Sequence, residues 1–502
     1  MSITRLLRPY FERVYRRSAR LNADAETTQR GLLARMLETA GQTEWGRKYG
    51  FAGIGSYEAF SRCVPVTDYE ALKQSIDQMR RGAPDVLWKG HVKWFAKSSG
   101  TTNDKSKYIP VSRQGLHDIH YAGGTDCVAY YLHHHPESRL FDGRALILGG
   151  SHEQNYEVIG SLVGDLSAIL IENINPLVNC IRTPQKSVAL LSDFETKRDL
   201  IARRAMTQNV TNLSGVPSWM LSVVSHMLQL SGKRNLREIW PNLEVFFHGG
   251  VAFTPYRNAY RELIPDDDMH YMETYNASEG FFGIQTDPDD RSMQLMANYG
   301  VFYEFIPLEE VGSENPTAVP LWGVETGRNY AMVITTTCGL WRYQIGDTVR
   351  FTSVRPYKFV ISGRTKSFIN AFGEELMVDN AEKGLAEACR QTGAEVAEYT
   401  AAPIFMDRDG KCRHQWVVEF RKKPESVSAF AEILDQALQK INSDYEAKRS
   451  KNITLQPLEM VEAREGLFDD WLRGKGKLGG QHKIPRLCND RKIIEEILSL
   501  QQ

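Results

Sequence analysis

The sequence lacks the features that mark a disulfide framework, a zinc site or a membrane span. Its 502 residues include 7 cysteines, an odd number, and no two of them have CxxC spacing. Single, scattered cysteines argue against both disulfides and zinc and fit a reducing compartment, so we expect a cytoplasmic protein. No apolar run is long enough to span a bilayer, and no signal-peptide core is visible near the N-terminus.

An excess of charge of one sign is also missing. Lys and Arg total 61 and Asp and Glu total 62, for a formal charge of −1. This balance gives no electrostatic reason to expect a nucleic-acid partner. The first 20 residues do contain six arginines among apolar residues. A membrane-surface helix or a transit peptide would explain them, but we favour an amphipathic first helix with a solvated basic face.

The order of the predicted elements indicates the α/β class. Residues 1 to about 90 read mainly as helices, and from there to about 360 short β-rich runs alternate with helical stretches. We predict a large N-terminal domain over 1–355, a hinge at about 353–364, and a smaller α+β domain over 364–502. In the smaller domain, Asp379 followed by Glu382 predicts a helix start with a capping box, and one long helix is expected over 426–448.

One segment has the composition of a phosphate-binding loop. KSSGTTNDKSKYIPVS, residues 97–112, places small hydroxyl residues, a glycine and lysines between two β-like runs. It is not a Walker A loop, because GxxxxGK[ST] is absent and a strand follows. The alternative is a Ser/Thr-rich surface turn. The residues that would donate to phosphate are Ser98, Ser99, Gly100, Thr101, Thr102 and Lys107.

Two further segments join a strand to residues suited to a nucleotide. In FHGGVAFTPY (247–256), Gly249 and Gly250 would let a flat base lie against the backbone; a plain strand-to-helix turn is the alternative. In METYNASEGFFGIQ (272–285), Glu279 would bind Mg²⁺ carried by ATP and Tyr275 would cover an adenine face. The alternative for this segment is a polar hairpin turn.

Three late segments complete the set of candidates. Asp347 in GLWRYQIGDTVRF (339–351) is suited to accept hydrogen bonds from two ribose hydroxyls. Arg364 lies at the predicted domain boundary, in VISGRTKSFINAFGEEL (360–376). Lys483 lies in GGQHKIPR, at the end of a glycine-rich tail that reads as a mobile loop carrying a cation.

The order of these segments resembles the acyl-adenylate-forming superfamily. The residues of these motifs are most similar to those of one branch, the Gretchen Hagen auxin-responsive promoter family of acyl acid–amido synthetases, and above all to its bacterial members. The segments that carry the resemblance, within about residues 40 to 490, are TEWGRKYGF (43–51), SSGTTNDKSKYIP, FHGG with TPY, ETYNASEG, LWRYQIGD and GGQHKIPR.

The resemblance implies a role for each matching residue. Ser98 to Thr102 and Lys107 match the phosphate loop, Gly249 and Gly250 the adenine-side turn, Tyr275, Ala277, Ser278 and Glu279 the AMP-contacting motif, Asp347 the ribose ligand, Arg364 the arginine beside the hinge, and Lys483 the catalytic lysine. Glu279 also matches the carboxylate linked to magnesium. The sequence departs from the superfamily at Asn103 and Asp104, where a glycine is usual, and at GGQHK, which replaces an SxGK-type ending.

These matches imply a large adenylate-forming domain of mixed β-sheets and helices with a mobile C-terminal domain. The implied activity is ATP-dependent and Mg²⁺-dependent activation of a small carboxylic acid as acyl-adenylate, catalysed by Lys483 and Glu279. Transfer to an amine, normally an amino acid, would form an amide. The alternatives are an acyl-CoA ligase and a non-catalytic nucleotide-binding protein.

The acid pocket is expected between the phosphate loop and the middle helices. The candidate elements are the helix 116–132 and GVPSWML (215–221), in which Trp219 and Met220 would line an apolar slot. Core packing is the alternative role for each of them. His120 is also a candidate for this pocket, against the alternative of a polar surface or satisfied core group.

Overall fold

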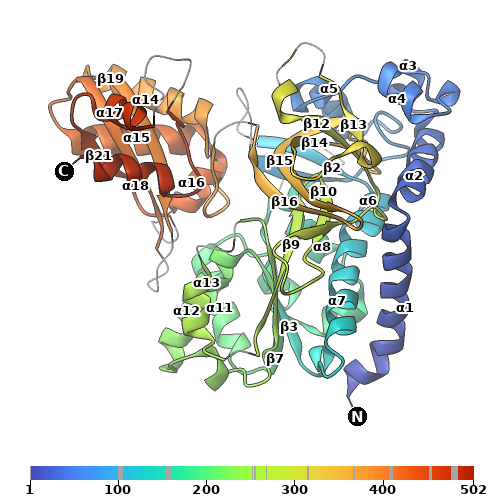
Figure 1. Cartoon of the computed structure of the whole chain (residues 1–502). Helices are drawn as coiled ribbons and strands as arrows, with labels where there is room; N and C mark the ends of the chain where they lie inside the picture. Colours follow the sequence, from blue (N-terminus) through green and yellow to red (C-terminus); the bar gives the residue numbers. More distant parts are fainter. Residues whose placement is uncertain are drawn as a thin grey trace.

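The computed structural model describes residues 2–99, 106–153, 161–251, 253, 256–266, 268–311, 313, 316–365, 368–374, 376–405, 411–450, 455–475 and 484–501. A large α/β body is followed by a smaller α+β unit that lies to one side of it, shown in orange and red in Figure 1. The predicted class, with a large N-terminal and a small C-terminal domain, is confirmed. Among these residues, none of the helices combines the length and apolar character that crossing a membrane requires.

Helices of the large domain surround its sheets. They are α1 (Ile3–Ala23), α2 (Ala25–Ala40), α3 (Glu44–Lys48), η1 (Phe51–Gly53), α4 (Tyr57–Cys63), α5 (Tyr69–Arg80), α6 (Arg113–Gly115), the π-helix η2 (Leu116–Tyr121), α7 (Ala122–His134), η3 (Leu140–Asp142), α8 (Leu166–Glu172), α9 (Pro176–Cys180), α10 (Lys186–Ala189), α11 (Phe194–Ala205), α12 (Pro217–Ser231), η4 (Leu236–Glu238), α13 (Arg257–Leu263), η6 (Leu308–Glu310) and η7 (Leu321–Gly323).

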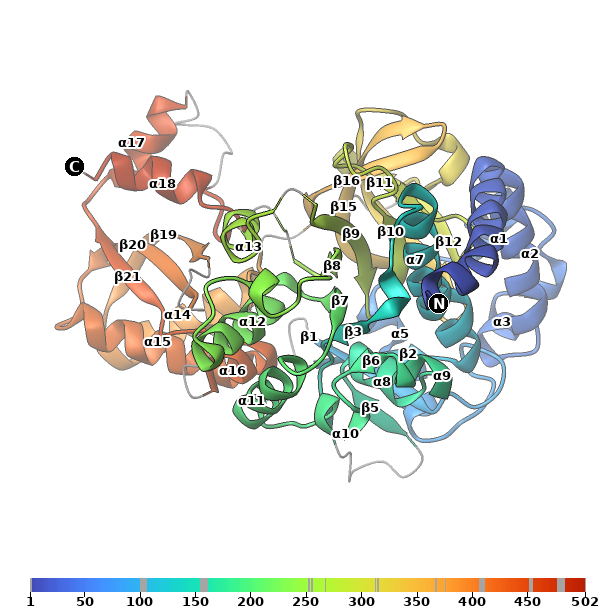
Figure 2. The same ribbon diagram turned by 90° about the horizontal axis from the view of Figure 1, so that it is seen from below.

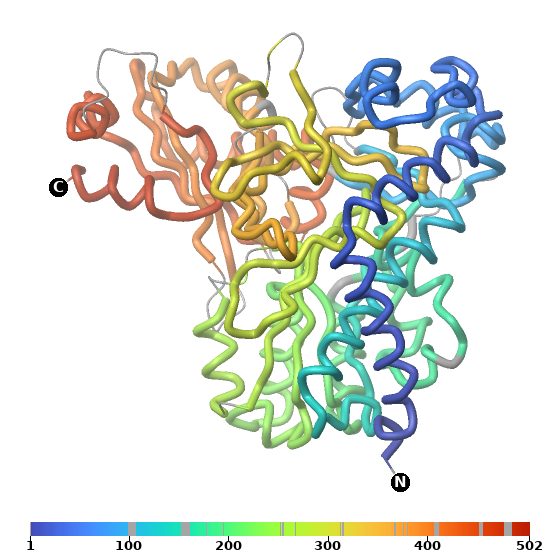
Figure 3. The backbone as a smooth tube through the Cα atoms, turned by 45° about the vertical axis from the view of Figure 1, so that its right-hand side comes forward, coloured from blue at the N-terminus to red at the C-terminus, as the bar shows by residue number. Residues whose placement is uncertain are grey.

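Local sequence explains these helices. In α5, for example, Asp68 caps the first turn by accepting a hydrogen bond from the backbone N–H of Ala71, and buried apolar residues recur with helical spacing. The basic first helix is amphipathic, as predicted. It lies along α7 (Figure 3), where Ser18 donates to the buried Asp126 and Arg8 donates to the carbonyl of Leu132.

Among the described residues, twelve strands form one large mixed sheet. In spatial order they are β13 (Val319–Pro320), β12 (Val301–Pro307), β14 (Asn329–Thr336), β15 (Tyr343–Val354), β16 (Tyr357–Arg364), β11 (Met293–Leu295), β10 (Gly280–Ile284), β9 (His270–Ala277), β8 (Val245–Gly249), β7 (Val210–Gly215), β3 (Arg144–Ile147) and β6 (Arg182–Thr183). The strands from β9 to β6 are parallel, and those from β13 to β9 pair antiparallel. A second sheet contains β2 (Ser106–Val111), β1 (Trp94–Ser99), β5 (Leu162–Gly164) and β4 (His152–Glu153).

The small domain is built around a three-stranded sheet. Its elements are β17 (Phe368–Ile369), β18 (Leu376–Met377), α14 (Val378–Thr392), β19 (Glu395–Ile404), β20 (Arg413–Lys422), α15 (Val427–Ile441), α16 (Ser443–Arg449), β21 (Glu459–Ala463), α17 (Leu467–Gly474) and α18 (Lys492–Ser499).

Two predicted helix boundaries in this domain are wrong. The helix expected to open at Asp379 begins at Val378, where the Asn380 side chain accepts the N–H of Met377, and Glu382 accepts a hydrogen bond from Tyr399 instead of completing a capping box. The single helix expected over 426–448 is two helices. Asn442 breaks it, because its side-chain oxygen accepts the N–H groups of the next helix's first turn.

The range predicted as a hinge, 353–364, is occupied mainly by sheet. Ser353 and Val354 end β15, and Tyr357 to Arg364 form β16, which pairs with β15 up to the Asp347–Arg364 position. The chain therefore leaves the large sheet after Arg364, at the C-terminal end of the predicted range.

Candidate functional site

Asp347 accepts hydrogen bonds from two other residues of the predicted site. The Tyr275 hydroxyl donates to its Oδ2 at 2.5 Å, and Arg364 Nε donates to its Oδ1 at 2.6 Å. Asp347 is 9% exposed and Tyr275 is 6% exposed. Charge-assisted bonds in so enclosed a setting are strong and hold the carboxylate in one orientation. Residues separated by up to 89 positions in the sequence thus form one cluster.

The large sheet brings this cluster together in two ways. Asp347 and Arg364 are direct partners in the β15–β16 register. Tyr275 lies on β9, which is separated from β15 by β16, β11 and β10, so the sheet must curl for its hydroxyl to reach Asp347. The Tyr275 ring packs against Phe282 and Phe359, with ring centroids 4.9 and 5.9 Å away. Its hydroxyl, rather than its ring face, is therefore what Tyr275 presents to the site.

The protonation state of Tyr275 follows from this environment. Burial and the negative charge of Asp347 raise the pKa of Tyr275 well above its ordinary value. The phenol therefore keeps its proton and acts as a donor to Asp347.

Glu279 lies in the two-residue turn that joins β9 to β10. Ala277 and Gly280 pair at the ends of the turn, with Ser278 and Glu279 between them. Glu279 is only 9% exposed, and its charge contributes to raising the pKa of Tyr275, although less than burial and Asp347 do. The polar-hairpin alternative describes the backbone correctly. A nearly buried carboxylate close to Tyr275 is nevertheless an unusual occupant for a turn.

The paired glycines at the end of β8 are required by the backbone. A Cβ on Gly249 would lie 2.4 Å from the carbonyl oxygen of Thr274 on the neighbouring β9, and Gly250 has φ +84°. Only glycine fits both conditions without displacement of the backbone. At Gly249 and Gly250 the backbone is therefore not covered by their own side chains. This turn lies at the edge of the sheet where β9 also ends.

The described parts of the predicted phosphate-loop segment belong to β1 and β2, which pair antiparallel. Ser98 pairs with Lys107 in the antiparallel register, and the Lys107 Nζ lies 6.0 Å from the Tyr69 ring centroid. For Ser99 the structure describes only the backbone, which belongs to β1. Gly100, Thr101, Thr102 and Lys483 lie outside the described residues, so their predicted roles stay predictions.

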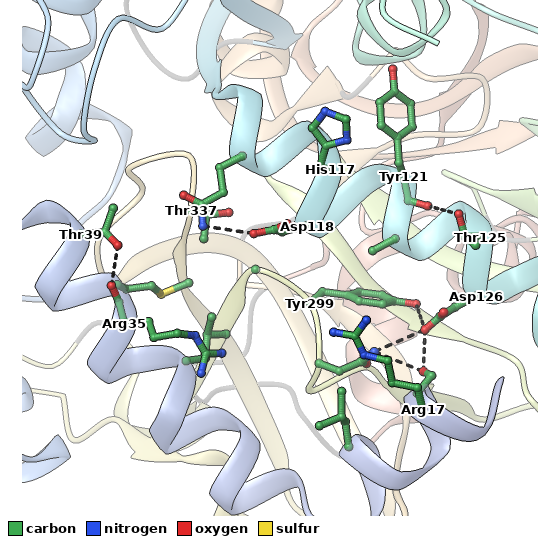
Figure 4. Close-up of a pocket in the computed structure, with 18 of the residues that line it drawn as sticks. Arg17, Arg35, Thr39, His117, Asp118, Tyr121, Thr125, Asp126, Tyr299 and Thr337 are labelled. Atoms are coloured by element: carbon green, nitrogen blue, oxygen red, sulfur yellow. Dashed lines mark hydrogen bonds between the residues drawn. The ribbon is translucent and has the colours of Figure 1, made fainter. Parts of the chain in front are cut away.

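A separate cavity of about 910 Å³ lies between the N-terminal helices and the helix that follows β2. Figure 4 shows Arg17 and Arg35 approaching it from α1 and α2, and His117 and Tyr121 from η2. Part of the helix 116–132 lines this cavity, but residues 215–221 do not, and the predicted role of both segments in an acid pocket stays a prediction. None of the predicted nucleotide-site residues lines it either.

Two features that matter near the site were not predicted. Arg342, inside the LWRYQIGD segment, forms a buried bidentate pair with Glu304, which also accepts a hydrogen bond from Tyr57. Glu304 lies on β12 and Arg342 just before β15, so the two partners are 38 residues apart and no local sequence pattern indicates that they pair. His248, beside the paired glycines, is buried and stacked on Phe253. Its place in an apolar run is the one sequence feature that indicates this burial.

The large mixed sheet, with the small α+β domain beside it, matches a known fold. Two solved structures share this fold. A GH3.15 acyl acid amido synthetase in complex with 2,4-DB has a TM-score of 0.62 at 18% identity, covering 97% of this chain and 95% of that one. A 2-hydroxyisobutyryl-CoA ligase in complex with 2-HIB-AMP and CoA has a TM-score of 0.59 at 13% identity, covering 95% and 91%.

The chain belongs to the GH3 family. The GH3 family N-terminal domain matches residues 15–269, the central domain residues 294–364, and the C-terminal domain residues 379–492. Similar proteins include the indole-3-acetic acid-amido synthetase GH3.3 of Arabidopsis thaliana, 23% identical over 95% of this chain and 91% of its own length. The indole-3-acetic acid-amido synthetase GH3.8 of Oryza sativa subsp. indica is 24% identical, over 95% and 90%. The family resemblance seen in the sequence is confirmed, while assignment to its bacterial branch stays a prediction.

Proposed function

We propose that this protein is an AMP-forming ligase that activates a small carboxylic acid as acyl-adenylate and transfers the acyl group to an amino acid. The observation that carries this proposal is the hydrogen-bonded cluster of Tyr275, Asp347 and Arg364 in a GH3-family chain, with the nearly buried Glu279 close enough to Tyr275 for its charge to raise that residue's pKa. Such a concentration of charge far from the surface is typical of functional sites.

Asp347 is suited to hold the ribose of ATP. Each carboxylate oxygen accepts more than one hydrogen bond, so the bonds from Tyr275 and Arg364 leave capacity for two ribose hydroxyls. The bare backbone at Gly249 and Gly250 would accept the flat adenine base. In this proposal Tyr275 and Arg364 orient Asp347, and Arg364 also brings a positive charge close to the nucleotide.

Glu279 is suited to the magnesium that accompanies ATP. It is a nearly buried carboxylate close to the Asp347 cluster, and Mg²⁺ prefers oxygen ligands of this kind. When bound, the metal would offset negative charge on the phosphates. Lys107, Lys483 and the donors of the 98–102 segment would contribute to the same end.

The chemistry has two balanced steps. First, the carboxylate of the acid attacks the α-phosphorus of ATP, and pyrophosphate leaves. Both reactants are anionic, so preorganised cations and donors lower the barrier. Then the amine attacks the acyl carbonyl and AMP leaves. A two-domain chain suits two steps, and we place the hinge after Arg364, where the chain leaves β16. Lys483 would act in the first step only.

His120 is our candidate for the acid pocket. It is 5% exposed, and within the described part of the chain its Nε2 has no hydrogen-bond partner. Burial lowers its pKa to about 4, so at neutral pH it is an uncharged donor or acceptor. Gly123, less than one turn further along, lies against the Phe281 ring two residues after Glu279. This face of the helix therefore points towards the β9–β10 turn.

The test is a screen of pyrophosphate release with aryl, indole and short fatty acids, each with and without a mixture of amino acids. The proposal predicts turnover that needs ATP, one acid and an amino acid, with formation of AMP and an amide. The structural likeness to a CoA ligase makes a second candidate, which predicts turnover with coenzyme A and no amino acid. A non-catalytic nucleotide-binding protein would bind AMP and release no pyrophosphate with any acid.

A further inference from the structure

The dipeptide Ala371–Phe372, in the turn between β17 and β18, is held from both sides. On the side of the small domain, the Glu374 carboxylate accepts hydrogen bonds from the backbone N–H groups of both residues. The N–H of Ala371 donates to Oε1 at 3.0 Å, and the N–H of Phe372 donates to Oε2 at 2.6 Å. The backbone of this turn is thus fixed within its own domain.

Glu374 is itself firmly anchored in the small domain. It is fully buried, and its Oε1 lies 2.8 Å from Nε2 of His414 on β20. Asn442, between α15 and α16, donates to the Glu374 carbonyl at 3.1 Å. Burial is the largest single influence and opposes ionisation of Glu374, but the hydrogen bond and charge of His414, together with the backbone N–H donors, outweigh it, and the pKa of Glu374 is lowered overall. The carboxylate therefore stays charged and continues to accept hydrogen bonds from the turn's backbone N–H groups.

The large domain holds the opposite edge of the same dipeptide. The Tyr256 hydroxyl, just before α13, donates to the Ala371 carbonyl at 2.6 Å. Trp219 Nε1, on α12, donates to the Phe372 carbonyl at 3.2 Å. Tyr256 and Phe372 are both fully buried, so the bond from Tyr256 forms away from water, while the bond from Trp219 is partly buried. Buried hydrogen bonds of this kind are costly to leave unmade.

A third contact joins the same tryptophan to the small domain. The Lys448 Nζ of α16 lies 3.8 Å from the Trp219 ring centroid. Figure 2 shows α16 beside α12 on the side of the large domain that faces the small one. Trp219 thus offers its N–H to one element of the small domain and its ring face to another.

The apolar packing agrees with these polar contacts. One hydrophobic cluster contains Met220, Tyr256 and Tyr260 of the large domain together with Ile369, Phe372 and Leu376 of the small domain. A continuous buried cluster shows that apolar packing, as well as hydrogen bonds, holds the two domains in this orientation.

We propose that Tyr256 and Trp219 are positioning residues. They fix the small domain in one defined orientation by their hydrogen bonds to the carbonyls of Ala371 and Phe372. We further infer, on the basis of the proposed function, that the hydrogen bonds from Tyr256 and Trp219 break when the enzyme passes between adenylation and amide transfer. Tyr256 and Trp219 therefore set the balance between the two half-reactions without touching the reacting atoms.

The chain offers closely matched controls. Tyr260 is equally buried and donates its hydroxyl to the Pro217 carbonyl at 2.8 Å, and Trp240 donates Nε1 to the Ala205 carbonyl at 2.9 Å. Both bonds lie wholly within the large domain. The double variant Tyr256→Phe/Trp219→Phe is therefore compared with Tyr260→Phe/Trp240→Phe, which removes the same kinds of donor away from the interface.

The first readout needs no substrate. Fluorophores attached through encoded non-natural residues at the exposed positions 233 and 425 report the distance between the domains by energy transfer in the full chain. We expect one narrow distance in the wild type and in the Tyr260→Phe/Trp240→Phe control. The Tyr256→Phe/Trp219→Phe variant should show a broadened or second distance. An unchanged distance distribution in that variant, or the same change in the control, would overturn the proposal.

The second readout is the ratio of pyrophosphate–ATP exchange to amide formation. Interface substitution should change this ratio at least about fivefold, whereas the control substitution should lower or preserve both rates together. A proportional loss of both rates in the interface variant would show a merely structural role. Failure of the proposed function would appear differently, as absence of exchange in the wild type with the distance readout intact.

Discussion

The side chains of Asp347 and Arg364 meet across the β15–β16 pair, where Arg364 Nε donates to Asp347 Oδ1 at 2.6 Å. Arg364 is the last residue of β16, so the cluster that orients Asp347 lies where the chain leaves for the small domain. A reorientation of the small domain about this point would act directly on the position of the carboxylate.

Asp347→Asn tests the ribose assignment. Replacing a charged acceptor weakens hydrogen bonds worth about 1.5–3 kcal/mol each, so KM for ATP should rise by roughly ten- to a hundredfold. Steady-state kinetics with varied ATP measure this. Asp290→Asn, which removes the partner of Lys358 elsewhere on β16, is the control and should leave KM for ATP unchanged. Equal KM values for Asp347→Asn and wild type would remove Asp347 from the nucleotide site.

Glu279→Gln tests the magnesium assignment. The amide keeps the shape of the side chain but loses its charge, so the Mg²⁺ concentration for half-maximal exchange should rise and the maximal rate should fall by about a hundredfold. Glu273→Gln is the matched control, because Glu273 is a partly buried carboxylate on β9, the strand that leads into the turn containing Glu279. If both variants respond to Mg²⁺ alike, Glu279 has no special role.

Arg342→Met tests the buried pair behind the site. Arg342 and Glu304 have side chains 5% and 1% exposed, and Arg342 also donates to the carbonyls of Ser61 and Val64. Removing one partner leaves a buried, uncompensated carboxylate and should lower the free energy of unfolding by about 3–5 kcal/mol. Arg328→Met, which breaks an exposed pair with Glu309, should leave denaturant unfolding unchanged. A fully stable Arg342→Met protein would contradict this reading.

His248→Phe should reduce the decrease in the free energy of unfolding that occurs as the pH falls. Burial, aided by Arg257, lowers the pKa of His248 to about 3. Between pH 6.5 and 3 the unfolded chain therefore binds a proton that the folded chain refuses, and stability falls as the pH falls. The variant should remove about 1.4 kcal/mol of this loss per pH unit. Unfolding measured from pH 7 to 4 checks it, with His91→Phe at an exposed position as a control; parallel profiles for His248→Phe and wild type would be the contrary result.

Local sequence predicted the elements better than their limits. The alternation of short β-rich runs with helical stretches between about residues 90 and 360 follows from apolar periodicity and is found in the large domain. The break at Asn442 was missed, because helical periodicity continues through it while a side chain satisfies the next helix's backbone. Residues 353–364 were predicted as a hinge, yet Ser353 and Val354 end β15, and Tyr357 to Arg364 form β16, which folds back to pair with β15.

The site was predictable in its members and not in its geometry. Family motifs named Tyr275 and Asp347, but the hydrogen bond between them depends on the curl of a sheet with three strands in between. The same curl explains why Tyr275 presents its hydroxyl and not its ring. The Tyr256–Ala371 bond joins two domains across 115 residues, and neither partner belongs to a polar pattern.

Pyrophosphate–ATP exchange in the absence of any amine is the most direct measurement of the central claim. The account predicts exchange only when a suitable acid is present, and its loss in Lys483→Ala but not in Lys477→Ala, which removes a lysine from the same glycine-rich segment. Exchange that proceeds without acid, or an unaltered rate in Lys483→Ala, would contradict acyl-adenylate formation as assigned to these residues.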